Sequence, residues 1–595
     1  MLKSEIKIFG GAPTLFINGE RTSHMAYTTY FEERSCCADF ADAGYRIFFA
    51  NASFTTLPIN SAATGFSPFR VGVFEDMENP DYSEFEREVY RMLAACPDAI
   101  IFPRINISMP KWWIEAHPEE TTLTNKGGRR EALFSERFRE DAADLLVRFI
   151  EHVKASDYAE RIGGWQICGG QTQEWFHHDL AGSLCDAAKA PFAKWVKERY
   201  GDENAALPSP EDFIYGGVAE NTNEHAKRYS LFCNEEVARS IDHFAKTIKE
   251  QTEFEQIVGT FYGYSFESNN TVLFGSHALR CLINSENLDF FSSPNAYTNN
   301  RAFGIDWSDM MPVDSVRLHG KLAFIECDIR THLTCAIQEV RPGEYPDDIY
   351  KTKDGKSVWA APPTRELSVS ALRKCFAHQL TKGSAIWWFD MWGGWYDDAA
   401  LMSEIAEMKK LYDNADPQGS VAEIAFFADE RGYANLFSRS PHLQGIRDTR
   451  TAMGNIGAPY DTIMVEDAEK LLKSYKAAVF AFPIASECGK KAISLCEELG
   501  IPYISATPEH TALTADEIET FIKAAGVHIY VDSRDVVYVG GGYVALHAAV
   551  GGKKQIKMPS TAKITAIFGA DIAEQITDTI EFELGEYETA LFKLN

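Results

Sequence analysis

The sequence is short of positive charge. Its 595 residues include 58 Lys and Arg but 86 Asp and Glu, which gives a formal net charge of −28. Such an excess of negative charge repels nucleic acid and anionic membranes. The sequence also lacks any run of about 18 apolar residues, and residues 1–7 contain no hydrophobic signal core. We therefore expect no nucleic-acid partner, no membrane partner and a cytoplasmic location.

The sequence also lacks the usual patterns for binding a metal through thiolates. Its twelve cysteines are scattered, and no CxxC pair occurs among them. Without an export signal they are better interpreted as reduced thiols than as a disulfide framework. The string His177-His178-Asp179 contains possible metal ligands, but adjacent histidines do not share a helix face. We predict neither a metal nor a cofactor.

Eight short apolar segments alternate with longer amphipathic segments over the first 400 or so residues. This alternation favours a (β/α)₈ barrel with insertions, with a doubly wound sheet as the alternative. The predicted strands are His24–Tyr30, Arg46–Ser53, Ala99–Ile107, Gly164–Cys168, Gln256–Tyr264, Leu288–Ser293, Leu322–Asp328 and Ser384–Phe389. The predicted helices include Tyr82–Ala95, Phe138–Ser156, Ala187–Tyr200, Glu224–Lys249 and Glu366–Leu380.

The pattern changes after Pro417-Gln418-Gly419. Four short strands spaced by helices predict a second, flavodoxin-like α/β domain: Val421–Ala428, Thr462–Val465, Ala477–Phe482 and Tyr503–Ser505. No GxGxxG follows its first strand, so no nucleotide site is predicted. Strand-like segments from His528 onward then predict a small β-sandwich: His528–Asp532, Val536–Val539, Tyr543–Ala549, Lys563–Phe568 and Thr579–Leu584. The predicted domains are residues 1–415, 416–527 and 528–595.

Polar and aromatic residues gather where the predicted barrel strands end. In a (β/α)₈ barrel the carboxyl ends of the strands carry the chemistry, so this asymmetry predicts a site. Glu174 follows the fourth strand and Glu326 ends the seventh. A retaining glycosidase needs two carboxyl groups about 5–5.5 Å apart, one as acid/base and one as nucleophile. We predict that Glu174 and Glu326 are this catalytic pair, with Asp328 or Asp390 as alternatives to Glu326.

Other residues at the same strand ends are candidates for binding the substrate, an oligosaccharide or another glycoside. They are Arg104, Asn106, Gln171, Gln173, Trp175, Tyr264, Tyr297, Trp392 and Trp395. Arg104 is equally compatible with binding a sugar hydroxyl or Glu326 and with a salt bridge at the barrel rim. Tyr262 and Tyr297 compete with Tyr264 for a place beside Glu326.

Local motifs resemble the glycoside hydrolase family 42 β-galactosidases of clan A. They are Met109–Pro110–Lys111–Trp112–Trp113, His117–Pro118–Glu119, Phe138–Arg139–Glu140–Asp141 and Gly164–Trp165–Gln166, all within about residues 99–200. The resemblance implies a barrel, a flavodoxin-like domain involved in trimerisation and a short β-domain. It also implies a retaining, exo-acting β-glycosidase in which Tyr264 orients the nucleophile, and a homotrimer. The cysteine cluster that binds zinc in some family members is absent.

The sequence departs from the family at the acid/base position. The family places Asn directly before the catalytic Glu, whereas this chain has Gly169-Gly170 there and reaches Glu174 through extra loop residues. Gln171 or Gln173 could supply the missing amide. Since contacts to the sugar 2-hydroxyl strengthen in the transition state, the change affects sugar choice. A β-mannosidase of the same barrel type and a catalytically inactive carbohydrate-binding homologue therefore stay open as alternatives.

Overall fold

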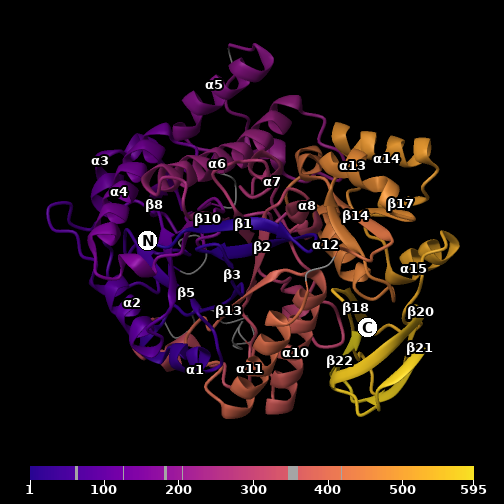
Figure 1. Cartoon of the computed structure of the whole chain (residues 1–595). Coiled ribbons are helices and arrows are strands. Elements are labelled where there is room, and N and C mark those ends of the chain that lie inside the picture. The colour runs from indigo at the N-terminus through magenta and orange to yellow at the C-terminus, as the bar shows by residue number, and fades with distance from the viewer. Residues whose placement is uncertain (61–64, 125, 180–183, 204, 346–359, 417–418) are drawn as a thin grey trace.

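The computed structural model describes residues 1–60, 65–124, 126–179, 184–203, 205–345, 360–416 and 419–595. Its largest part is a closed barrel of eight parallel strands, so the doubly wound alternative is wrong (Figure 1). All eight predicted strands are present. They are β4 (Met25–Thr28), β5 (Ile47–Ser53), β6 (Ile100–Asn106), β9 (Gly164–Cys168), β10 (Ile257–Phe261), β11 (Phe290–Ser292), β12 (Leu322–Cys327) and β13 (Ala385–Phe389).

Aromatic rings fill the barrel interior. Phe49 lies 5.2 Å from Phe102, 5.5 Å from Phe324 and 5.0 Å from Trp387, measured between ring centroids. Glycines make room for such rings: a Cβ on Gly259 would lie 2.2 Å from the Phe290 ring. The interior is therefore a packed core, and the chemistry is left to the strand ends.

Helices surround the barrel, and the five predicted ones are present. The helices are α1 (Cys37–Asp42), α2 (Ser83–Ala95), α3 (Lys111–Ala116), α4 (Glu136–Ala155), α5 (Lys189–Tyr200), α6 (Glu224–Gln251), α7 (Leu279–Leu282), α8 (Val313–Leu318), α9 (Ile337–Val340), α10 (Arg365–Lys382) and α11 (Ala399–Asp413). Side chains cap the longest ones: Ser135 accepts from Phe138 N, and Asn223 accepts from His225 N and Ala226 N. A short hairpin, β7 (Thr121–Leu123) and β8 (Arg129–Glu131), lies between α3 and α4. Among the described residues, no helix is long and apolar enough to cross a membrane.

A small N-terminal sheet covers the end of the barrel where the strands begin. It consists of β1 (Ser4–Phe9), β2 (Ala12–Ile17) and β3 (Glu20–Arg21). The Leu2 amide donates to Ile162 O just before β9, and the Ile257 amide at the start of β10 donates to Ser4 Oγ. The opposite end, where the strands finish, is left for the site.

A second parallel sheet follows the barrel, drawn in orange in Figure 1. Its order is β15-β14-β16-β17, the doubly wound order predicted for a flavodoxin-like unit. Its elements are β14 (Ile424–Ala428), α12 (Pro441–Met453), β15 (Asp461–Met464), α13 (Ala468–Leu471), β16 (Ala477–Phe480), α14 (Glu487–Leu499), β17 (Tyr503–Ser505) and α15 (Ala515–Ala524).

The C-terminal part is all β, as predicted, but its strands differ in part from the predicted ones. Its strands are β18 (Val536–Gly540), β19 (Tyr543–His547), β20 (Gly552–Phe568), β21 (Gln575–Leu584) and β22 (Thr589–Leu594). They are linked in one hydrogen-bonded order, β18-β19-β22-β20-β21, in which the long β20 pairs with both β21 and β22, and they enclose a hydrophobic core of their own. The predicted strand His528–Asp532 is not a strand, and β22 was not predicted. The division of the chain at residues 415 and 527 stays a prediction, and Pro417 and Gln418 lie outside the described residues.

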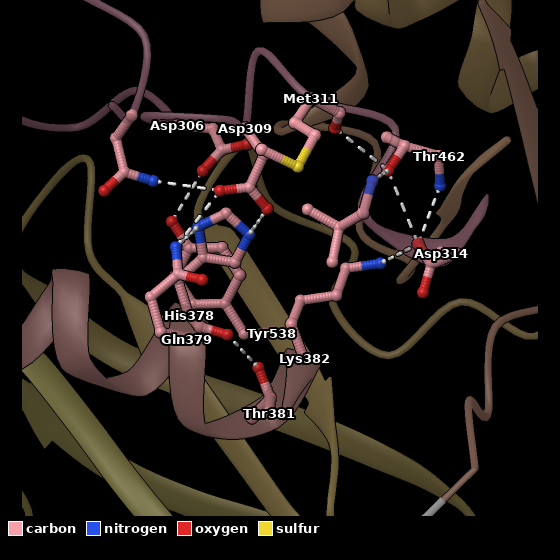
Figure 2. A network of polar contacts seen from close by, with 12 residues as sticks. Asp306, Asp309, Met311, Asp314, His378, Gln379, Thr381, Lys382, Thr462 and Tyr538 are labelled. Carbon is pink, nitrogen blue, oxygen red and sulfur yellow. Dashed lines mark hydrogen bonds and ion pairs between the residues drawn. The ribbon is translucent and has the colours of Figure 1, made fainter. Parts of the chain in front are cut away.

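A buried polar network fixes the three parts to one another (Figure 2). Lys382, at the end of α10, forms ion pairs with Asp314 of α8 (3.1 Å) and Asp461 of β15 (3.2 Å). Tyr538 of β18 donates to Asp306 at 2.6 Å, and its ring stacks on that of His378 of α10. Because these partners come from the barrel, the second sheet and the C-terminal sheet, the parts are positioned as one unit.

Candidate functional site

A cavity of about 610 Å³ opens where the barrel strands end, which is a volume typical of ligand sites. Glu174 lies in its lining, as do the predicted binding residues Gln171, Tyr264 and Tyr297. Helix α12 of the second sheet forms another part of the wall. The cavity therefore joins the barrel mouth to the flavodoxin-like unit.

Glu174 reaches the cavity through a tightly folded loop after β9. The loop turns back on itself, so that the Trp175 amide donates to Gly169 O and the Gln171 amide to Phe176 O, both at 2.8 Å. Four of its residues have positive φ, namely Gly170 (65°), Thr172 (57°), Gln173 (66°) and Trp175 (62°). Left-handed backbone at non-glycine residues costs energy and gathers at functional sites. The fold thus holds Glu174 beside the strand end.

We expect Gly170→Ala to lower kcat by about 100-fold, since a displacement of about 1 Å can cost that much. A Cβ at this position would lie 2.6 Å from Phe176 O, and the backbone is left-handed. Steady-state kinetics and the melting temperature should be measured together. Gly201→Ala, at a left-handed glycine with no atoms within 4 Å of the added Cβ, is the matched control. Wild-type kcat in Gly170→Ala would contradict the assigned role of this loop.

The surroundings of Glu174 make its carboxyl group hold a proton more strongly than an exposed glutamate does. Tyr264 OH donates to Glu174 Oε1 at 2.5 Å, and the Thr172 hydroxyl donates to Oε2. Burial raises the pKa of Glu174 to about 6, against the lowering effect of these two hydrogen bonds and of the Arg104 charge. A pKa in this range matches the demand on a general acid.

Glu326 ends β12 and is 5% exposed. Burial raises its pKa well above the usual value, and the charges of Asp328 and Glu174 raise it further. The positive charges of Arg104 and Arg301 act in the opposite direction. Asp328 is itself held by Arg301, at 2.5 Å, and by the Tyr297 hydroxyl, at 2.9 Å. Glu174 and Glu326 therefore interact electrostatically as parts of one buried cluster of charges.

Arg104 lies inside this cluster and not in a salt bridge at the rim. It donates to Asn51 Oδ1 at 3.1 Å and to the Tyr30 hydroxyl at 3.2 Å, and its guanidinium lies over the rings of Phe261 and Trp387. Its Nε has no hydrogen-bond partner among the described residues. Neighbouring Asn106 donates to Ser53 Oγ and accepts from Ser108, so its amide is already engaged.

Three of the predicted aromatic binding residues are buried. Trp175 is fully buried, and its Nε1 donates to Thr260 at 2.8 Å. Trp392 is 2% exposed and packs against Phe31 and Phe66, while Trp395 is fully buried in the same cluster. None of the three lines the cavity. Their large apolar surfaces pack the loops behind the site.

Tyr264 is at the site but has another partner than expected. The sequence predicts it beside Glu326. Its hydroxyl binds Glu174, and the charges of both Glu174 and Glu326 raise its pKa, after burial. Tyr297 is 38% exposed and presents its ring to the cavity, with Arg301 over it at 4.3 Å. The tyrosines therefore contact different carboxylates, Tyr264 the acid/base candidate and Tyr297 Asp328.

The two predicted glutamines are both buried, and only one faces the cavity. Gln171 lines it, and its Oε1 has no hydrogen-bond partner among the described residues. Gln173 is fully buried, and neither atom of its amide group has a partner within the described part of the chain. Of the two, Gln171 is the one placed to meet a ligand.

Several residues of the site were not predicted from the sequence. Thr172 and Arg301 contact the carboxylates, and Gln444, Arg447, Asp448 and Thr451 line the cavity from α12. Asp328 was predicted only as an alternative nucleophile, and Asp390 likewise. Asp390 binds the Tyr27 hydroxyl and the amides of Gly394 and Trp395, so it organises the loop after β13.

The possible metal ligands are also engaged elsewhere. His177 contacts Cys233 O, and His178 contacts Glu131, with both histidines buried. Within the described residues, no group of three or more His, Cys, Asp or Glu side chains could hold a metal ion.

Comparisons with known proteins agree with this fold. The family model described as "Beta-galactosidase" of glycoside hydrolase family 42 matches residues 86–209. A comparison with the sequences of curated proteins finds no match. A solved catalytic mutant of Gan42B, a GH42 β-galactosidase from G. stearothermophilus, is 11% identical with a TM-score of 0.61, covering 97% of this chain and 100% of that one. The cold-adapted β-galactosidase from Rahnella sp. R3 is 11% identical with a TM-score of 0.60, covering 96% and 98%.

The shared fold does not determine which sugar a protein acts on. An α-L-fucosidase, isoenzyme 2 from Paenibacillus thiaminolyticus, also matches with a TM-score of 0.52 and 9% identity, covering 96% of this chain and 100% of that one. At such low identity these structures establish the fold alone. The matched family model includes the segment that carries the predicted motifs. The chain is therefore similar in local sequence and in fold to the β-galactosidases of glycoside hydrolase family 42, as the motifs predicted.

Proposed function

We propose that this protein is a retaining, exo-acting β-glycosidase that hydrolyses terminal β-linked sugars. The observation that carries the proposal is a buried cluster that contains Glu174, in the loop after the fourth strand, and Glu326, at the end of the seventh. Burial raises the pKa of both carboxyl groups, and the charge of Glu174 raises the pKa of Glu326 further. Two interacting carboxyl groups titrate as a unit and share a proton. A retaining mechanism starts from one protonated and one ionised carboxyl group.

In the proposed reaction Glu174 donates its proton to the glycosidic oxygen while Glu326 attacks the anomeric carbon. The bond to the leaving group breaks, and a covalent bond from Glu326 to the sugar forms. Glu174 then takes a proton from water, which attacks the anomeric carbon and releases Glu326. Arg104 and Arg301 favour the ionised form of Glu326. Tyr264 and Thr172 hold the Glu174 carboxyl in place.

The first choice of substrate is a β-galactoside, and a β-mannoside is the alternative. The specific observation that keeps the second open is the Gly169-Gly170 pair after β9, which leaves the amide role to a residue such as Gln171. Aryl β-galactoside, β-mannoside, β-glucoside and β-fucoside should be assayed side by side. Hydrolysis of none of them, together with binding of a sugar, would favour an inactive carbohydrate-binding homologue. The homotrimer and the cytoplasmic location likewise stay predictions.

We expect kcat/KM to decline on the alkaline side as Glu174 loses its proton, with a midpoint near its pKa of about 6. The Tyr264 hydrogen bond lowers this pKa, so Tyr264→Phe should move the alkaline limb to higher pH. Full pH profiles of wild type and variant provide the measurement. Tyr262→Phe is the control, because Tyr262 donates to the main chain at Gly275 O. An alkaline limb that stays in place or moves down in Tyr264→Phe would show that Glu174 is not the acid.

A further inference from the structure

The cavity has two walls of different character. The barrel side carries Glu174 and the rings of Phe176, Phe274 and Tyr297. The polar part of the lining includes two separate segments: Thr298 and Asn299 after β11, and α12 of the second sheet. Glu174 and these polar residues therefore line the same cavity.

The exposed edge of α12 is regular. Gln444, Asp448 and Thr451 are spaced as i, i+4 and i+7, which places them on one face of the helix. At 1.5 Å per residue this edge is about 10 Å long, which exceeds the width of one pyranose ring. Gln444 Nε2 donates to Asp448 Oδ1 at 2.7 Å, so the two side chains form a continuous polar surface.

An ion-pair cluster fixes this wall relative to the catalytic acid. Arg447 of α12 contacts Glu267 at 3.0 Å, and Arg450 contacts the same carboxylate at 3.5 Å. The Glu267 amide donates to Tyr264 O, and the Tyr264 hydroxyl binds Glu174. The distance from α12 to the reacting centre is thus set by a short chain of direct contacts.

The charged groups of this wall neutralise one another. Arg447 and Arg450 pair with Glu267, and their charges lower the pKa of that carboxyl. What the wall offers to a ligand is a set of amide, hydroxyl and carboxylate groups that donate and accept hydrogen bonds. A neutral ligand with many hydroxyl groups matches such a surface better than an ion or a flat apolar group.

We infer that α12 forms the subsite for the leaving group, and that the natural leaving group is itself a sugar residue. Gln444 and Asp448 are assigned as the residues that bind its hydroxyls. The inference rests on the proposed function and assigns its leaving-group subsite to residues of the second sheet: the reducing-side residue of a disaccharide or oligosaccharide lies against α12. The second sheet then contributes to specificity within the same chain.

The test compares a disaccharide with an aryl glycoside that carries the same terminal sugar. For the variant Gln444→Ala/Asp448→Ala, we expect the ratio of kcat/KM for the disaccharide to kcat/KM for the aryl glycoside to fall at least tenfold. Transfer of the terminal sugar to an added saccharide acceptor, relative to hydrolysis, should fall as well, because the acceptor occupies the same subsite.

The matched control is Ser494→Ala/Glu498→Ala, which removes a neutral polar and an acidic side chain at the same i, i+4 spacing on the exposed face of α14. This control should keep the wild-type ratio. An unchanged ratio and unchanged transfer in the α12 variant would overturn the inference while leaving the glycosidase proposal intact. Failure of wild type to hydrolyse any glycoside would instead overturn the proposed function.

Discussion

Replacement of Glu326 by Ala is expected to lower kcat on the best aryl glycoside by about 10⁴-fold or more, as removal of a nucleophile does in other enzymes. Glu326 is the carboxyl group at the end of β12, 5% exposed, with Arg104 and Arg301 acting on its charge. Without it no covalent intermediate forms. Added azide should restore turnover by attacking from the vacated side, and the product should be the glycosyl azide of inverted anomeric configuration.

Glu174→Ala is the matched comparison, because it removes the same type of side chain, in this case the proposed acid/base and not the proposed nucleophile. Its loss should be about 10²–10⁴-fold for a disaccharide, which needs a general acid, and much smaller for a dinitrophenyl glycoside, which does not. Azide should here give the product of retained configuration. If both variants keep wild-type kcat, the pair is wrong. If the two azide products are exchanged, the roles of Glu174 and Glu326 are reversed.

Lys382→Ala is expected to lower the free energy of unfolding by about 3–5 kcal/mol, the usual cost of breaking a buried ion pair. The Lys382 side chain is 17% exposed and contacts Asp314 (8%) and Asp461 (4%). Its removal leaves two carboxylates facing each other between α8 and β15. Urea unfolding, followed by fluorescence at fixed protein concentration, measures the change.

The pH dependence of the stability loss in Lys382→Ala gives a second measurement. In wild type, Lys382 and Arg317 hold the pKa of Asp314 below its usual value, so this stabilisation is lost as the pH falls through that pKa. In the variant Asp314 keeps Arg317, but both carboxyl groups lose Lys382, so we expect their pKa values to rise and the carboxyl groups to bind protons in the folded state. The difference in the free energy of unfolding between wild type and Lys382→Ala should therefore become smaller as the pH falls from 7 to 5. Lys470→Ala, at an exposed lysine 3.7 Å from Asp467, is the control and should cost about 0–1 kcal/mol. A loss of only about 0–1 kcal/mol in Lys382→Ala would contradict the stabilising role of the network in Figure 2.

Periodicity predicted the barrel because buried parallel strands are apolar along their whole length. Segments such as Leu322–Asp328 and Ser384–Phe389 stand out between amphipathic helices, and all eight were located within a few residues. The C-terminal sheet was harder to predict. Strand β20 carries charged and polar residues on its exposed side, such as Lys553, Gln555 and Lys557, so its first half gives a weak strand pattern.

The site was predictable where it depends on strand ends and not where it depends on loops. Glu326 and Arg104 lie on strands, so the barrel topology alone brings them to the mouth. The partner of Tyr264 and the burial of Trp175 depend on the left-handed turns after β9, for which the sequence offers only two glycines as a signal. The position of the α12 wall depends on how the second sheet packs against the barrel. This packing is determined by contacts between residues far apart in the chain, such as Glu267 and Arg447, which a sequence pattern does not reveal.

The N-terminal hairpin has a practical consequence for handling the protein. Because β1 and β2 seal the barrel at the base, with Leu2 and Ser4 bonded to the segments that lead into β9 and β10, the amino terminus points away from the substrate entrance. Immobilisation on a solid support through an amino-terminal tag should leave the catalytic mouth open to the medium. An attachment near Asn299 or Gln444 would instead crowd the path by which glycosides arrive.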